Sequence, residues 1–160
     1  MRNTFLVLAI SLLLIVAAGG VGLAQSAVTT GLVTVDSVYG VDETTDRLES
    51  TLRDRGLIVV ARVDHAANAR RVGKELRPTQ LLIFGNPQLG TELMQSRQTA
   101  GIDLPQKLLV WEDAAGQAHV TYNDPQYLAQ RHGIEGEDQA LAMISNALNG
   151  LASSVTTRGK

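Results

Sequence analysis

Short apolar runs alternate with segments of helical periodicity along the chain, and this alternation predicts strands and helices in turn. Residues 32–39 alternate between apolar and polar side chains, which is typical of a strand with one buried face. Residues 57–63 are rich in β-branched side chains and residues 80–84 are mostly apolar, so both stretches predict strands. Two further strands are predicted at 107–113 and 117–122.

Helical segments fill the spaces between these strands. Apolar residues recur there at intervals of three or four, and residues that favour helix ends stand at the borders. Asp42 and Asp64 are predicted to cap helices that run to Arg55 and Leu76. The other helices are predicted after the Asn86-Pro87 start as far as Gly101, at 127–132, and at 137–149 with Gly150 as the C-terminal cap.

The last two strands are predicted to form a hairpin, because Ala114-Ala115-Gly116 fits a type I turn closed by a glycine in a bulge. That turn places Asp113 opposite Gln117 and fixes the register of the hairpin. The pairs that follow are Trp111 with His119, Val110 with Val120, and Leu108 with Tyr122. A hairpin argues against a wholly parallel sheet, so the predicted fold class is α+β.

The amino-terminal segment has the pattern of a secretory signal. Arg2 precedes an apolar run from Phe5 to Ala18, and small residues up to Ala24 form a cleavage site. Cleavage after Ala24 predicts a periplasmic or secreted protein, and the alternative is a membrane anchor formed by residues 5–23. The predicted organisation is a signal peptide at 1–24, a flexible lead at 25–31, one domain at 32–150 and a disordered tail at 151–160.

The amino-acid composition excludes several kinds of reactive site and partner. The 160-residue chain contains no cysteine, which excludes disulfides, thiolate nucleophiles and thiolate metal sites. It has 14 basic and 16 acidic residues, no basic block, and only two Phe, one Trp and three Tyr. A nucleic-acid partner is therefore not expected.

Several strings of residues together resemble the domain of unknown function 302 family (DUF302) over about Tyr39 to Gly133. The strings are Val63-Asp64-His65-Ala66-Ala67, Leu76-Arg77-Pro78-Thr79-Gln80, Ile83-Phe84-Gly85-Asn86-Pro87, Gly101-Ile102-Asp103-Leu104-Pro105, Trp111-Glu112-Asp113 and Thr121-Tyr122-Asn123-Asp124-Pro125. The resemblance implies a curved, mainly antiparallel sheet of about five strands packed by helices, similar to the TATA-binding-protein-like arrangement, and a homodimer. It implies no known reaction and assigns no catalytic residue.

Two of the candidate binding groups follow strands directly. Asp64 and His65 join a strand to a helix, where a carboxylate beside an imidazole suits a base or a ligand. The alternative makes Asp64 a helix cap and His65 a residue of the first helical turn. Asn86 opens a helix whose N–H groups suit an anion, although Pro87 removes one donor and no lysine stands nearby. Its alternative role is again a cap.

The other candidates come from the hairpin. Glu112 and Asp113 suit a cation site with Asp124, but neighbouring residues of a strand point to opposite faces, which favours a solvated turn instead. Trp111 and His119 form either a platform for a small ligand or a plain cross-strand pair. The three histidines lie on three different elements, so the sequence assigns no metal site, and it leaves the cofactor undefined.

These observations favour an exported, non-enzymatic homodimer that binds a small ligand, a metal ion or another envelope protein. The alternative is a small enzyme or metal-binding protein that uses Asp64 and His65 with Asn86 and Glu112 around one pocket. A third alternative is a purely structural dimer module with an apolar patch and no pocket. Convergence of the candidate side chains on one cleft would favour the enzyme.

Overall fold

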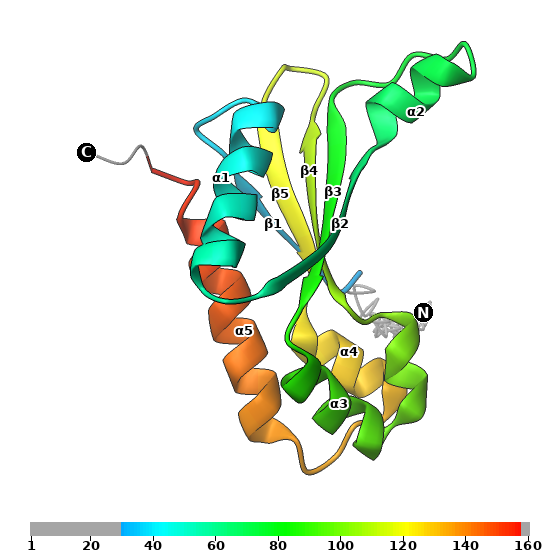
Figure 1. Ribbon diagram of the computed structural model, residues 1–160, viewed down its shortest axis with the longest axis vertical. Helices are drawn as coiled ribbons and strands as arrows, with labels where there is room; N and C mark the ends of the chain where they lie inside the picture. The colour runs from blue at the N-terminus through cyan, green and yellow to red at the C-terminus, as the bar shows by residue number, and fades with distance from the viewer. Residues whose placement is uncertain (1–29, 158–160) are drawn as a thin grey trace, which may run out of the picture.

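The computed structural model describes residues 30–157, so the predicted signal peptide (1–24) and most of the predicted lead (25–31) lie outside the described residues. The strands are β1 (Leu32–Asp36), β2 (Ile58–Asp64), β3 (Thr79–Gly85), β4 (Gln106–Glu112) and β5 (Ala118–Asn123). The helices are α1 (Val41–Asp54), α2 (His65–Arg71), α3 (Pro87–Ser96), the 3-10 helix η1 (Gln98–Ile102), α4 (Pro125–His132) and α5 (Asp138–Ser153). Figure 1 shows their arrangement.

The strands form a single twisted sheet in the order β1-β5-β4-β3-β2, and every neighbouring pair is antiparallel. This confirms the predicted α+β class and the five-stranded antiparallel sheet. The hairpin register is confirmed as well, because Trp111 pairs with His119 and Val110 with Val120. The Asp113 N–H donates to the Gln117 carbonyl at 2.9 Å, which closes the turn as predicted.

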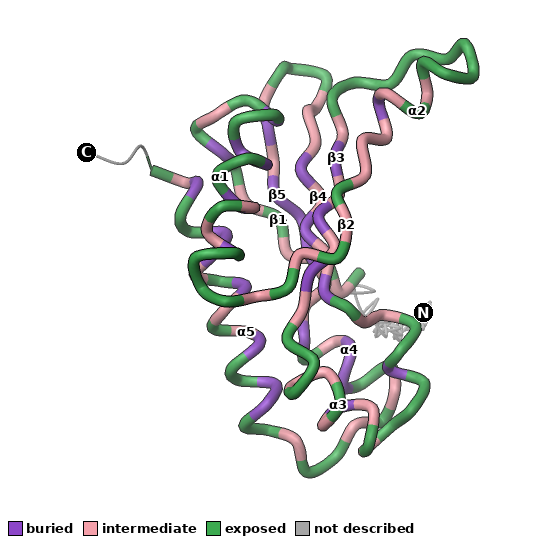
Figure 2. Tube along the Cα trace, in the orientation of Figure 1, coloured by how far each residue is buried: buried purple, intermediate pink, exposed green. Residues whose placement is uncertain are grey.

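Helices α1 and α5 cover one face of the sheet, and the hydrophobic core lies between them and the strands (Figure 2). Leu82, Leu108, Val110 and Val120 have no exposed surface, and alternate strand residues supply them, as a strand period of two requires. The opposite face, which we call the open face, contributes no side chain to this core within residues 30–157. Some of its apolar side chains, such as Leu109, are half-buried, and others, such as Leu32, are exposed.

The sheet has two ends that matter for function. At the hairpin end lie the β4–β5 turn, the end of β1 and the start of α2. At the other end, which we call the α3 end, Gly85 of β3 and Gln106 of β4 lie beside the start of β2, and helices α3 and α4 pack below the strands (Figure 1).

Helix α1 begins earlier than predicted. Val41 is its first residue and Gly40 stands at the N-cap without a side-chain hydrogen bond, so the predicted Asp42 cap is wrong. Asp42 instead accepts a hydrogen bond from Nε2 of Gln80, a buried residue of β3. Gln80 also accepts from Nε of Arg62, so this buried amide is paired at both its nitrogen and its oxygen.

The predicted end of the last helix and the predicted disordered tail are both wrong for the described residues. Helix α5 continues through Gly150 to Ser153 instead of ending at Asn149, and the predicted disordered tail (151–160) is ordered as far as residue 157. Leu151, Ala152 and Val155 are buried in the core. The carbonyl of Val155 accepts from the Val38 N–H at 3.0 Å, which ties the end of the chain to the end of β1.

Two other helices are shorter than predicted. Helix α2 ends at Arg71 instead of Leu76, and Gly73 follows with a positive φ of 68°. Helix α3 ends at Ser96, and the residues up to Ile102 form η1. Within residues 30–157, no helix is both long and apolar enough to span a membrane.

Candidate functional site

The candidates named for an enzyme do not converge. Asp64 pairs with Gln80 at the hairpin end of the sheet, where Glu112 also lies. Asn86 follows the last residue of β3 at the α3 end. Six residues at about 3.3 Å each separate Gln80 from Asn86, so the two ends are roughly 20 Å apart. No single cleft therefore holds Asp64, His65, Asn86 and a further carboxylate.

The two strand-end candidates have structural roles. The Asp64 carboxylate accepts from the Ala67 N–H at 2.7 Å and caps α2. The Asn86 side chain accepts from the Gln88 N–H at 2.9 Å and caps α3. His65 is half-buried in the first turn of α2, and its ring has no hydrogen-bond partner among the described residues. Helix capping therefore accounts for the side-chain oxygens of Asp64 and Asn86.

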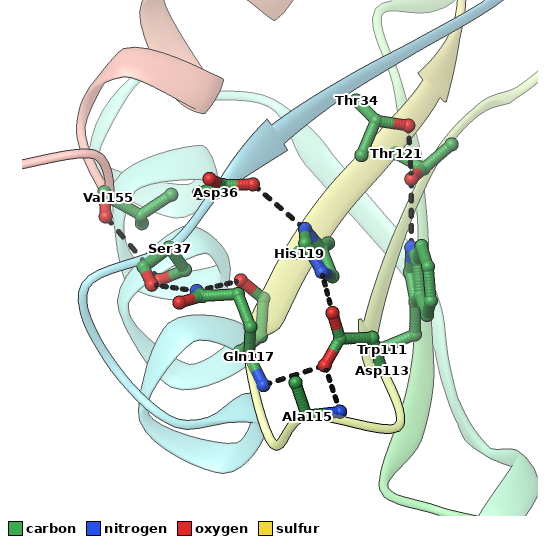
Figure 3. A network of polar contacts seen from close by, with 11 residues as sticks. Thr34, Asp36, Ser37, Trp111, Asp113, Ala115, Gln117, His119, Thr121 and Val155 are labelled. Atoms are coloured by element: carbon green, nitrogen blue, oxygen red, sulfur yellow. Dashed lines mark hydrogen bonds and ion pairs between the residues drawn. The ribbon is translucent and has the colours of Figure 1, made fainter.

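Trp111 and His119 lie side by side on the open face, with ring centroids 4.7 Å apart and planes tilted by 32°. Nδ1 of His119 lies 2.9 Å from the Asp36 carboxylate, and Nε2 lies 3.2 Å from that of Asp113 (Figure 3). The indole N–H of Trp111 donates to Oγ1 of Thr121 at 2.9 Å. The pair was predicted, but the contacts of His119 with Asp36 and Asp113 were not. Both carboxylates hold the imidazole in place.

Asp113 organises the hairpin turn. Its carboxylate accepts from the N–H groups of Ala115 and Gln117, and these bonds with the nearby His119 hold the pKa of Asp113 below its ordinary value. The backbone hydrogen bond from Gln117 is the largest cause. A lowered pKa means that the folded state prefers the ionised carboxylate.

Asp113→Asn is expected to reduce the acid sensitivity of the fold. Asparagine keeps the acceptor oxygen but loses the charge, and the contribution of the ionised carboxylate is present above the unfolded-state pKa of about 3.9. It is lost as the pH falls through the lower folded-state pKa. Urea unfolding between pH 6 and 2.5 measures the free energy of unfolding of both proteins. Below about pH 4 this free energy should fall more steeply with decreasing pH for the wild type than for Asp113→Asn. Parallel curves would contradict this role.

A second polar cluster was not predicted. Nε2 of His132, the last residue of α4, lies 2.6 Å from the Asp103 carboxylate, and Nδ1 lies 3.1 Å from Oγ1 of Thr99. Arg131 approaches the same carboxylate at 3.4 Å. These contacts fasten η1 to α4. Thr99 and His132 are 33 residues apart, so no local pattern indicates the contact. No group of three metal-binding side chains occurs within residues 30–157.

A cavity of about 320 Å³ lies at the α3 end, between the sheet, α3 and α5. Its walls are mainly apolar and include no charged residue. The lining residues are Leu57, Ile58, Val60, Phe84, Gly85, Asn86, Pro87, Leu89, Gly90, Thr91, Met94, Leu104, Pro105, Gln106, Ile144, Ala147 and Leu148. Asn86 is the sequence-predicted candidate that lines it. Ligand pockets occupy about 300–1,000 Å³, so this cavity has the size of a small-molecule site.

Gln106 is the unusual residue of this cavity. It begins β4, pairs with Phe84 and is 7% exposed. Its Nε2 is the one buried side-chain nitrogen or oxygen without a hydrogen-bond partner within residues 30–157. An unpaired buried N–H costs about 1–3 kcal/mol, so native structures rarely keep one without a reason. Sequence reasoning missed it, because a glutamine at a strand start carries no distinctive pattern.

An antiparallel five-stranded sheet with helices on one face and at both ends defines an α+β domain with an open sheet face. Residues 33–151 match the family model described as domain of unknown function DUF302, and the chain therefore belongs to this family. The crystal structure of an uncharacterised conserved DUF302 protein from Bacillus stearothermophilus has the same fold. Its TM-score is 0.71 at 23% identity, covering 79% of this chain and 99% of that one.

The curated relatives that the chain matches have names that differ from the family description. Over 122 residues the chain is 47% identical to proteins named fluoride-specific ion channel FluC 1 from Brucella suis biovar 1 (strain 1330) and Brucella abortus biovar 1 (strain 9-941). These matches cover 75% of this chain but only 48% and 45% of the relatives. The chain thus spans about half the length of the curated relatives that it matches.

Proposed function

We propose that this protein is a non-enzymatic binding module that holds a small, mainly apolar molecule in the cavity at the α3 end. The cavity itself carries this proposal, because its volume and apolar walls suit a ligand of modest size. The polar candidates support it indirectly: Asp64 and Asn86 serve as helix caps, and they lie at opposite ends of the sheet. A binding role requires neither of them as a catalyst.

Ala147→Phe is expected to weaken ligand binding at least tenfold, because Ala147 of α5 lines the cavity and a phenyl ring would occupy it. The measurement is a titration of the purified full chain with 2-ethylnaphthalene, followed by ligand-observed NMR. Ala142→Phe is the matched control, since Ala142 lies on the same helix but is exposed. Equal affinities of the two variants, or no binding by the wild type, would refute the proposal.

We extend the proposal to the location and assembly of the protein. The apolar run from Phe5 to Ala18 and the small residues up to Ala24 support export to the periplasm. The open face carries half-buried apolar side chains, among them Leu81, Ile83 and Leu109, which suit a homodimer interface with a second copy of the chain. Leu109→Lys is a direct test, because sedimentation should then report a monomer.

A second candidate function comes from the curated relatives. Proteins named as fluoride channels contain a region 47% identical to this chain, yet no described helix here could span a membrane. The other half of those relatives would then form the pore, and this chain would correspond to an accessory module of a fluoride channel. Deleting the gene should lower the fluoride concentration that cells tolerate, and unchanged tolerance would contradict this candidate.

A further inference from the structure

We infer that the cavity selects a neutral ligand with one hydrogen-bond acceptor, such as a ketone, ester or amide oxygen, and that Gln106 recognises this acceptor. The inference rests on the proposed binding function of the cavity and adds the chemical class of the ligand. It is carried by one buried donor without a partner and by the lack of charge in the cavity walls.

Gln106 is placed to meet a ligand inside the cavity. It stands at the first position of β4, and its backbone partner in the sheet is Phe84, which lines the same cavity. The residue is 7% exposed, and its Nε2 atom is buried without a hydrogen-bond partner, so bulk water does not satisfy this donor. The last torsion of a glutamine side chain is soft, so a half-turn about it exchanges the positions of Nε2 and Oε1 without any backbone movement, and a ligand acceptor that reaches the amide selects the orientation that presents Nε2.

The other polar groups of the cavity are less suited to this role. The side-chain oxygen of Asn86 is used by the Gln88 N–H at the start of α3. Thr91 is exposed on α3, so its hydroxyl group has access to water. Gln106 is therefore the buried group that gains most from a ligand acceptor, because its donor has no competing partner.

The charge distribution disfavours an anionic ligand. Lys107, the next residue, points to the other face of β4, and its ammonium group donates to the carbonyls of Asp103 and Pro105 at 2.8 and 3.0 Å. No residue of the cavity wall is charged. A carboxylate in this cavity would be desolvated without a counter-ion, which is strongly unfavourable. Apolar walls with a single donor thus match a neutral molecule with one acceptor.

The test uses three probes with the same aromatic body: 2-acetylnaphthalene, 2-ethylnaphthalene and 2-naphthoate. The first two have nearly the same shape and differ in one carbonyl oxygen. The wild-type chain is expected to bind the ketone about tenfold more tightly than the hydrocarbon, which is the effect of one hydrogen bond to an unpaired buried donor. The carboxylate is expected to bind more weakly than either.

Gln106→Leu is expected to abolish the preference for the ketone and to leave the affinity for 2-ethylnaphthalene unchanged or higher. The matched control is Gln126→Leu, which makes the same substitution at an exposed glutamine of α4 that does not line the cavity, so it should retain the preference. Gln106→Met gives a second apolar variant if the leucine variant unfolds more easily. Urea unfolding of each variant verifies that the domain is intact.

The possible outcomes separate this inference from the proposed function. If ketone and hydrocarbon bind equally, or if the preference survives in Gln106→Leu, the role of Gln106 is refuted while the cavity remains a binding site. If the carboxylate binds most tightly, the inference of a neutral ligand is refuted. If none of the three probes binds, both the inference and the proposed function fail.

Discussion

Leu151→Ala is expected to lower the free energy of unfolding by about 2–5 kcal/mol, the range for removing a fully buried leucine side chain. Leu151 has no exposed surface and packs in the core between α5 and the sheet. A typical domain has a free energy of unfolding of only about 5–15 kcal/mol, so this change is a large part of the total. Urea unfolding followed by circular dichroism measures it.

The control for this prediction is Met143→Ala on the same helix. Met143 is 50% exposed, so its truncation leaves almost no cavity and should change the stability by less than about 1 kcal/mol. If the two variants were equally stable, the end of α5 would contribute little to the fold, and the sequence-based prediction of a disordered tail would be restored.

Gly31→Ala is expected to lower the free energy of unfolding by about 2–4 kcal/mol, for two reasons. Gly31 has a φ of 69°, a left-handed conformation that side chains with a Cβ rarely adopt. A Cβ atom there would also lie 2.2 Å from Cγ of Tyr127 on α4, so the tyrosine ring would have to move. The Gly31 carbonyl accepts from the Asp124 N–H at 2.8 Å, which limits any adjustment of the backbone.

Gly56→Ala separates the two causes. Gly56 has nearly the same φ of 71°, but no heavy atom lies within 4 Å of the place where a Cβ would be. It should therefore cost only about 1–2 kcal/mol, the conformational part. If thermal or urea unfolding gave the two variants the same loss, the contact between Gly31 and Tyr127 would have no measurable effect.

Most of the fold was predictable because local patterns determine it. Strand alternation and the turn at Ala114-Ala115-Gly116 were sufficient to give the register of β4 and β5, which the structure confirms. The end of α5 was not predicted because Gly150 was interpreted as a C-terminal cap. The signal that would have corrected this is the spacing of Leu148, Leu151 and Val155, which continues the buried stripe of the helix by steps of three and four.

The candidate site was much less predictable. Asn86 was found because the Gly-Asn-Pro motif marks the junction of a strand and a helix, and that junction borders the cavity. The Asp36–His119 contact joins residues 83 positions apart, and only the arrangement of β1 beside β5 brings them together. Gln106 was missed for a similar reason: its unpaired donor depends on the packing of α3 and α5 around it, and no neighbouring residue in the sequence indicates that packing.

The described chain starts and finishes at opposite ends of the sheet, and this has a practical consequence for surface-based binding assays. Leu32 pairs with Asn123 at the α3 end, whereas Val155 is bonded to Val38 at the hairpin end. Immobilising the protein through a linker placed directly before Thr30 would turn the cavity toward the sensor surface and obstruct small molecules. A linker placed after Thr157 would leave the cavity facing the flowing solution, so immobilisation through the carboxyl side is the suitable orientation.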